Sequence, residues 1–138
     1  MATQVSVGLQ KESINGHAAI ALALLSAWED KRRERTGGPT LQEISTRIST
    51  LLDENIAIHD LGLRRVPGGV YSEEVETFVG HLLAEGLATH RSPVQLTSDG
   101  EKLLRMIIRV ESRDHANTIR RAGELLKLNT SELLGEVV

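Results

Sequence analysis

Cysteine is absent from the 138-residue chain, which excludes a disulfide framework and any thiolate metal site. Long apolar runs are absent as well: the longest, AAIALALL at residues 18–25, is far shorter than the ~20 residues that a membrane-spanning helix needs. The first residues, MATQVSVGLQKES, lack the basic and apolar regions of a secretory signal. We therefore expect a cytoplasmic protein that makes no use of a membrane.

An excess of positive charge is also missing. The net charge is −3 and the isoelectric point lies near 5.9. Any binding of nucleic acid would therefore have to rest on a local patch of basic residues.

Motifs of enzymes are not found either. The chain has no P-loop, no G-x-G-x-x-G, no G-x-S-x-G and no H-E-x-x-H. Its five histidines include no i,i+4 pair, and without cysteine a zinc site is not expected. Three glutamates at 73, 74 and 76 could suggest an acid–base or metal cluster, but glutamates in the first turn of a helix are explained by the helix dipole. We expect no catalysis, no metal and no cofactor.

What remains is an ordinary globular composition, 40% hydrophobic and 25% charged, in a chain long enough for one domain over residues 1–138. The pattern is mostly helical. Apolar residues recur at helical spacing in residues 17–35, and Gly37-Gly38-Pro39 ends that helix. Thr40 and Glu43 form a capping box for a second helix over residues 40–53.

A third helix is expected to begin at Ser72, a good N-cap, and to end at Gly86. The next stretch, LATHRSPVQLTSDG at residues 87–100, consists of two short extended pieces around a turn, followed by a helix capped by Ser98 and Glu101. We expect the core at Val75, Phe78, Val79, Leu82, Leu87 and Leu96, with Trp28 nearby and His81 at its edge.

Three helices, a two-stranded wing and a further helix follow the order of a winged helix-turn-helix. The sequence therefore predicts a mostly α fold of this class over about residues 17–110. A helical bundle with an incidental loop is the alternative.

The residues after 110 predict a C-terminal helical extension over 111–138: a helix to about Leu128 and a short one capped by Asn129 or Thr130. This part of the chain holds more apolar residues than a small core would absorb. We therefore expect a homodimer whose contact is led by Ile107, Ile108, Ile119 and Leu126.

Arginines are the candidate DNA contacts. Arg91 lies at the predicted tip of the wing, where a winged helix places a side chain against phosphate. Arg105 and Arg109 share one face of the predicted fourth helix with Lys102 and Arg113. Arg64 and Arg65, in the long connection before the third helix, would support them, whereas the basic run KRRER at residues 31–35 is equally well explained as solvated surface.

The predicted recognition helix is acidic, which weakens the case for DNA. Glu73, Glu74 and Glu76 would face a polyanion, and their repulsion opposes the counterion release that drives binding. The connection between the second and third helices is also about fifteen residues, against three or four in a helix-turn-helix. The same glutamates would suit a basic protein partner bound by the helix over 72–86.

Residues 62–104 resemble the winged-helix segment of Panacea-type proteins, a family found with toxin–antitoxin loci and prophages. The matching elements are Gly69-Val70-Tyr71-Ser72, Gly86-Leu87-Ala88 and Leu96-Thr97-Ser98-Asp99-Gly100. TLQEISTRISTLLDENI stands where the family has its KLQKLLY helix. The resemblance implies a winged-helix fold and a regulatory or partner-binding adaptor, and it brings no catalytic residues.

Two functions therefore remain open. The first, favoured by the commonest use of winged helices, is a dimeric transcriptional regulator that binds double-stranded DNA. The second is an antitoxin-like or phage-related adaptor that binds a protein through its acidic helix.

Overall fold

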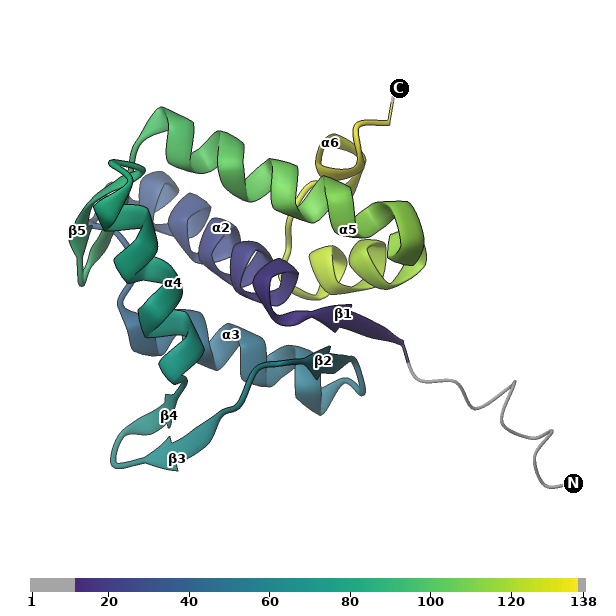
Figure 1. Ribbon diagram of the computed structural model, residues 1–138, viewed down its shortest axis with the longest axis horizontal. Coiled ribbons are helices and arrows are strands. Elements are labelled where there is room, and N and C mark those ends of the chain that lie inside the picture. Colours follow the sequence, from purple (N-terminus) through teal and green to yellow (C-terminus); the bar gives the residue numbers. More distant parts are fainter. Residues whose placement is uncertain (1–11, 137–138) are drawn as a thin grey trace, which may run out of the picture.

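The computed structural model describes residues 12–136, which are mostly helical and carry three small two-stranded sheets (Figure 1). In chain order the elements are β1 (Ser13–Asn15), α2 (Gly16–Glu34), α3 (Leu41–Asp53), β2 (Ala57–His59), β3 (Arg64–Val66), β4 (Gly69–Tyr71), α4 (Glu73–Ala84), β5 (Ala88–Arg91), β6 (Val94–Leu96), α5 (Ser98–Leu125) and α6 (Thr130–Leu134). Among these described residues, no helix is long and apolar enough to cross a lipid bilayer.

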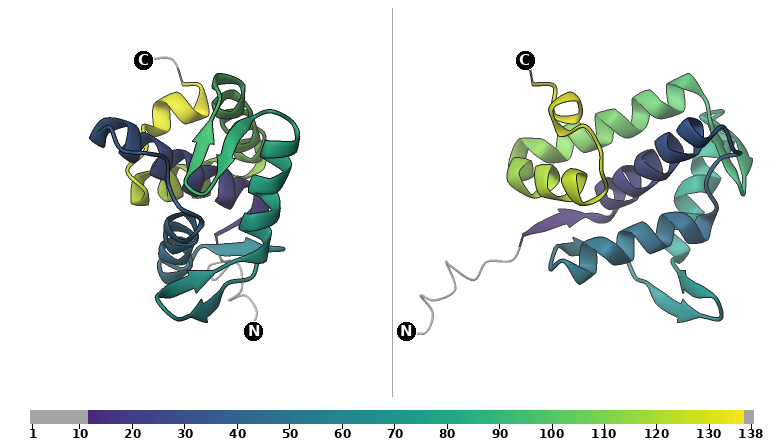
Figure 2. Two further views of the ribbon diagram at one scale, coloured as in Figure 1. Left: turned by 90° about the vertical axis from the view of Figure 1, so that its left-hand side faces the viewer. Right: turned by 180° about the vertical axis from the view of Figure 1, so that it is seen from behind.

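Helix α2 lies at the centre of the molecule, with α3, α4 and α5 packed around it (Figures 1 and 2). All of residues 18–28 are buried, so this stretch of the helix has no solvent-facing side. Its many alanines are short, which lets the neighbouring helices approach closely. The longest apolar run of the sequence is therefore the innermost helix.

The predicted helix boundaries are largely confirmed by the capping residues. Thr40 and Glu43 form the capping box of α3, Ser72 caps α4, and Asn129 caps α6. Gly86 follows α4 with φ +74°, in the left-handed region. The cap expected at Ser98 is wrong: Thr97 caps α5, and its hydroxyl accepts a hydrogen bond from the N–H of Gly100 at 3.0 Å.

The hairpin predicted between the third and fourth helices is present as β5 and β6, which pair antiparallel. The connection between α2 and α3 lies against its second strand, because the Val94 N–H donates to the Pro39 carbonyl at 2.7 Å. Gly38 makes this approach possible, since a Cβ there would lie 1.5 Å from the Val94 carbonyl oxygen. The hairpin is thus held on both sides, by α4 and by the α2–α3 connection.

The connection between α3 and α4, residues 54–72, expected as a loop of about fifteen residues, contains three short strands. β2 pairs in parallel with β1, with Ile58 opposite Ile14, and so joins segments more than forty residues apart. β3 and β4 form a second hairpin that projects beside the start of α4 (Figure 1). Arg64 and Arg65 therefore lie on a strand rather than in a loop.

α5 runs through residue 110, near which the C-terminal extension is expected to begin. α5 bends at His115, whose φ and ψ are −137° and 42°, and its second half returns along the core (Figure 1). Residues beyond 110 complete the single hydrophobic core, and they include Ile119, Ala122, Leu126, Leu128 and Leu133.

The side chains predicted to form a dimer contact lie mostly inside the single chain, which corrects that prediction. Ile108 and Ile119 are fully buried, Leu126 is 5% exposed, and Ile107 is half-buried against the same core. The apolar surplus that suggested a second copy is therefore used to cover α2.

The predicted core is confirmed at Val75, Val79, Leu82 and Leu96, which are buried with Trp28. Phe78 and Leu87 are only half-buried. The Phe78 ring lies near the edge of the core, with its centroid 5.9 Å from that of His17. His81, expected at the core edge, is exposed.

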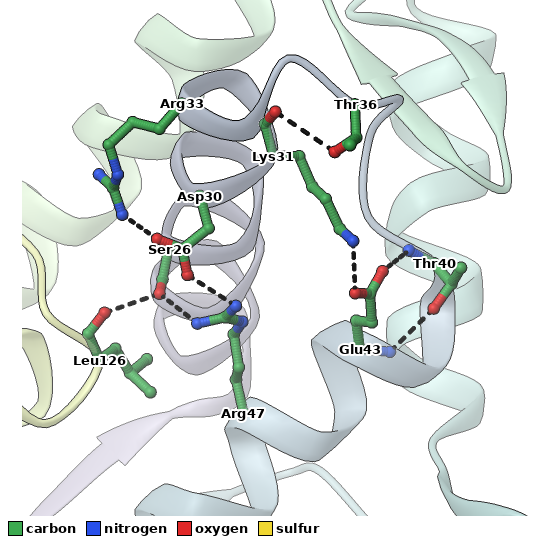
Figure 3. Close-up of polar contacts among 9 residues, drawn as sticks. All are labelled: Ser26, Asp30, Lys31, Arg33, Thr36, Thr40, Glu43, Arg47 and Leu126. Carbon is green, nitrogen blue, oxygen red and sulfur yellow. Dashed lines mark hydrogen bonds and ion pairs between the residues drawn. The ribbon is translucent and has the colours of Figure 1, made fainter.

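Polar contacts join α2 to its neighbours on the side shown in Figure 3. Ser26, buried in α2, donates to the Leu126 carbonyl at 2.7 Å and accepts from Arg47 of α3 at 2.9 Å. Arg47 also pairs with Asp30 at 2.8 Å. About one turn earlier in α3, Glu43, the carboxylate of the capping box, lies 2.9 Å from Lys31.

Candidate interaction surface around helix α4

Helix α4 runs between the two hairpins, with β3–β4 near its first residues and β5–β6 beyond its last (Figures 1 and 2). Ser72 fixes where the helix begins, because its hydroxyl accepts from the Val75 N–H at 3.3 Å. Val75, Val79 and Leu82 turn inward. The glutamates of the first turn are therefore directed away from the core, toward the β3–β4 hairpin.

Glu74 is used within the fold. Its carboxylate accepts hydrogen bonds from the Gly62 N–H at 3.2 Å and from the Ser72 hydroxyl at 3.1 Å. The Gly62 N–H, donating to the charged form, holds the pKa of Glu74 below its ordinary value. Glu74 thus anchors the connection before β3 to the start of α4.

Glu76 links the two hairpins. It accepts a hydrogen bond from the Tyr71 hydroxyl at the end of β4, and its other oxygen lies 4.0 Å from Arg91 of β5. The Arg64 guanidinium lies over the Tyr71 ring, 5.1 Å from its centroid. Donation to Glu76 raises the pKa of Tyr71, so this hydroxyl stays protonated. A continuous series, Arg64–Tyr71–Glu76–Arg91, crosses the outer side of α4.

Glu73 is the glutamate left open to solvent. Among the described residues it has no hydrogen-bond or ion-pair partner. It borders two adjoining cavities, one of about 220 Å³ with Leu63, Arg64 and Tyr71, and one of about 240 Å³ with His17 and Phe78. Leu63, Tyr71 and Phe78 supply apolar and aromatic walls beside this carboxylate, and Arg64 adds a positive charge to the first cavity only.

The five arginines predicted to contact DNA are divided between two places. Arg64, Arg65 and Arg91 are exposed on the hairpins around α4. Arg105 is half-buried and pairs with Glu29 of α2 at 3.0 Å and with Glu132 of α6 at 2.7 Å. Arg109 donates to the Glu132 carbonyl at 3.3 Å. Arg105 and Arg109 therefore hold α6 in place and do not join the arginines around α4.

Tyr71 is a member of this surface that reasoning from the sequence missed. It is the single tyrosine of the chain and directly precedes the Ser72 cap. That position, next to an acidic helix start, could have marked it. Within residues 12–136, no group of three or more His, Asp or Glu side chains is arranged to hold a metal ion.

No protein-family model, curated protein or solved structure matches this chain.

Proposed function

We propose that the chain is a winged-helix module that binds a basic segment of a partner protein through the outer side of α4. The order α2, α3, α4, hairpin and α5 supports the winged-helix class, as does the contact of the α2–α3 connection with β6. The resemblance of residues 62–104 to Panacea-type proteins supports an antitoxin-like or phage-related adaptor.

The observation that carries this proposal is the open carboxylate of Glu73 beside two cavities. Its neighbours Glu74 and Glu76 have partners within the chain, but their charge remains and adds to the local negative potential. A lysine or arginine of the partner would meet Glu73 from the second cavity, which Arg64 does not line, and place its aliphatic stem on the Phe78 ring.

A DNA-binding transcriptional regulator is the second candidate. It is favoured by Arg65 and Arg91, which are exposed on the hairpins at the two ends of α4. Those positions could reach phosphates on either side of a groove. Two facts weigh against it: α4 itself would direct glutamates at the polyanion, and Arg105 and Arg109 are held by α6.

Charge reversal at Glu73 separates the two functions. If a protein is bound, Glu73→Lys abolishes recovery of a partner with the tagged chain. Glu85→Lys, a change at the exposed C-cap of the same helix, leaves recovery intact. A partner retained by Glu73→Lys would refute the proposed site.

Duplex DNA supplies the other half of the test. If DNA is bound, affinity falls steeply with salt, and Arg91→Ala reduces the log–log slope by about one unit for all sequences alike. Glu73→Lys then raises the affinity for any sequence by removing repulsion. Absence of DNA binding at low salt would leave only the protein-binding proposal.

A further inference from the structure

A second surface, on α5, is distinct from the α4 site in charge and in shape. Of the three large hydrophobic side chains that are exposed among the described residues, two lie here, Met106 at 56% and Val110 at 49%. They are one helical turn apart, so they share one face. Half-buried Leu103 and Ile107 extend this apolar stripe down to the core.

Cations border the stripe on one side. Lys102, Arg109 and Arg113 are exposed and follow at seven- and four-residue steps, which places them along one edge of the face. Lys102 and Arg113 have no hydrogen-bond or ion-pair partner within residues 12–136. Arg109 donates one hydrogen bond to the Glu132 carbonyl.

The acidic groups nearby do not neutralise this edge. Glu111 is held by Asn15, whose backbone and side-chain N–H groups donate to it at 2.7 and 2.8 Å. Glu132 is paired with Arg105. Asp99 and Asp114 lie just outside the two ends of residues 102–113. The centre of this face of α5 therefore remains apolar and cationic.

We propose that this face, Lys102, Met106, Arg109, Val110 and Arg113, binds an amphipathic helix of a partner protein that carries acidic residues beside its apolar stripe. Apolar residues at i and i+4 on the face match the i, i+3, i+4 spacing of a helix packed against it. Acidic residues on the incoming helix pair with Lys102 and Arg113, which the fold leaves unused.

A second copy of the chain suits this face less well. Two α5 helices packed antiparallel about Met106 would bring the edge with Lys102 and Arg109 against the same edge of the copy, and like charges would oppose each other. Duplex DNA suits it less well too, because Met106 and Val110 lie directly beside the cations and have no favourable contact with phosphate.

The proposal does not depend on the role of α4. If both hold, the module joins a basic segment at α4 to an acidic helix at α5. Binding at α5 would then persist in Glu73→Lys, so the two proposals can fail separately.

Three synthetic helical peptides of equal length test the site. Each carries leucines at i, i+3, i+4 and i+7, and the residues beside them are all Glu, all Gln or all Lys. Fluorescence anisotropy with the full chain should show the Glu peptide binding about tenfold more tightly than the Gln peptide and the Lys peptide weakest, with the preference reduced by salt.

Two variants and a control locate the binding. Met106→Glu weakens binding of the Glu peptide at least about tenfold, and Lys102→Gln combined with Arg113→Gln abolishes its advantage over the Gln peptide. Leu52→Glu, at the third exposed hydrophobic residue, leaves binding unchanged. Thermal melts confirm that these surface variants fold.

Equal binding of the Glu and Gln peptides, or binding unaffected by Met106→Glu, would overturn the proposal. So would a dimer in sedimentation that Met106→Glu dissociates, since the face would then belong to a second copy. The proposal would also be overturned if the chain bound duplex DNA and this binding required Lys102 and Arg113 but not Met106. The face would then be a nucleic-acid site.

Discussion

Gly38 occupies a position where no side chain fits. A Cβ there would lie 1.5 Å from the Val94 carbonyl oxygen and 3.3 Å from Cζ3 of Trp28. The first obstacle is backbone of the hairpin, which cannot rotate away as a flexible side chain could. The hydrogen bond from Val94 to Pro39 depends on this close approach.

Gly38→Ala is therefore expected to destabilise the protein by about 1–3 kcal/mol or more, as overpacking does when backbone must move. Gly37→Ala is the matched control, because its Cβ would make an ordinary contact at 3.7 Å with Pro93. We expect it to change stability by no more than about 0.5 kcal/mol. Urea titration of both variants measures the change in the free energy of unfolding. Equal losses of stability would show that the hairpin backbone moves to accommodate a Cβ at residue 38.

At the scale of elements, the clearest junction is between the end of α2 and the start of α3. Lys31 of α2 reaches the Glu43 carboxylate, which also accepts from the Thr40 N–H at 2.8 Å (Figure 3). Burial raises the pKa of Glu43, but the hydrogen bonds from Thr40 and Lys31 outweigh it, and the pKa lies below its ordinary value. The bond to Glu43 raises the pKa of Lys31.

This junction predicts a pH dependence. A carboxyl whose pKa is depressed in the folded state stabilises the protein above its unfolded pKa, and the stabilisation is lost as pH falls through the folded value. The stability gap between wild type and Glu43→Gln should therefore be largest above about pH 5 and shrink toward about pH 3. Urea titrations at both pH values measure it.

Glu85→Gln serves as the control for that measurement, because the Glu85 carboxylate has no partner among the described residues. A gap for Glu43→Gln that is the same at both pH values would mean that the Lys31 contact contributes nothing to folding.

Helix ends could be predicted from the sequence because each cap depends on residues close together in the chain. Strands that pair with residues far away in the sequence could not. The caps at Thr40, Ser72 and Asn129 involve residues three apart, so the sequence reveals them directly. Thr97 and Ser98 are adjacent and equally suited to cap, so the choice between them depends on Thr97 also donating to the Leu87 carbonyl. The β1–β2 pair has only three residues a strand and a long separation in sequence.

The candidate surface around α4 likewise has some features that are visible in the sequence and others that depend on long-range packing. The acidic start of α4 and the exposed arginines are visible in the sequence. The partners of Arg105 are not: Glu29 is 76 residues away, and only the packing of α5 on α2 brings the two together. Burial of Ile108 and Ile119 likewise depends on the bend at His115, for which no proline or glycine gives a local signal.

At the scale of the whole molecule, the C-terminal residues belong to the domain. Ile119, Leu126, Leu128 and Leu133 are all in the core. Arg121 of α5 pairs with Glu12 at 2.6 Å and donates to the Glu54 carbonyl at 2.7 Å, so it joins the residue before β1 to the end of α3.

Removal of residues 111–138 is therefore expected to prevent folding. Four large apolar side chains contribute about 6–12 kcal/mol by burial, which is comparable to the whole stability of a typical domain. The chain 1–110 should show no cooperative thermal transition by circular dichroism, whereas a chain ending at Leu128 should still melt cooperatively. A cooperative melt of 1–110 would show that these residues fold without the C-terminal ones.

The burial of α2 on all sides has a consequence for synthesis on the ribosome. Leu126 and Leu133, which help to cover residues 18–28, are added roughly 100 residues after them. At about 5–20 residues per second, this delay is about 5–20 seconds, during which an unusually apolar nascent segment lacks its native cover. We expect the nascent chain to depend on chaperones until Leu133 has emerged.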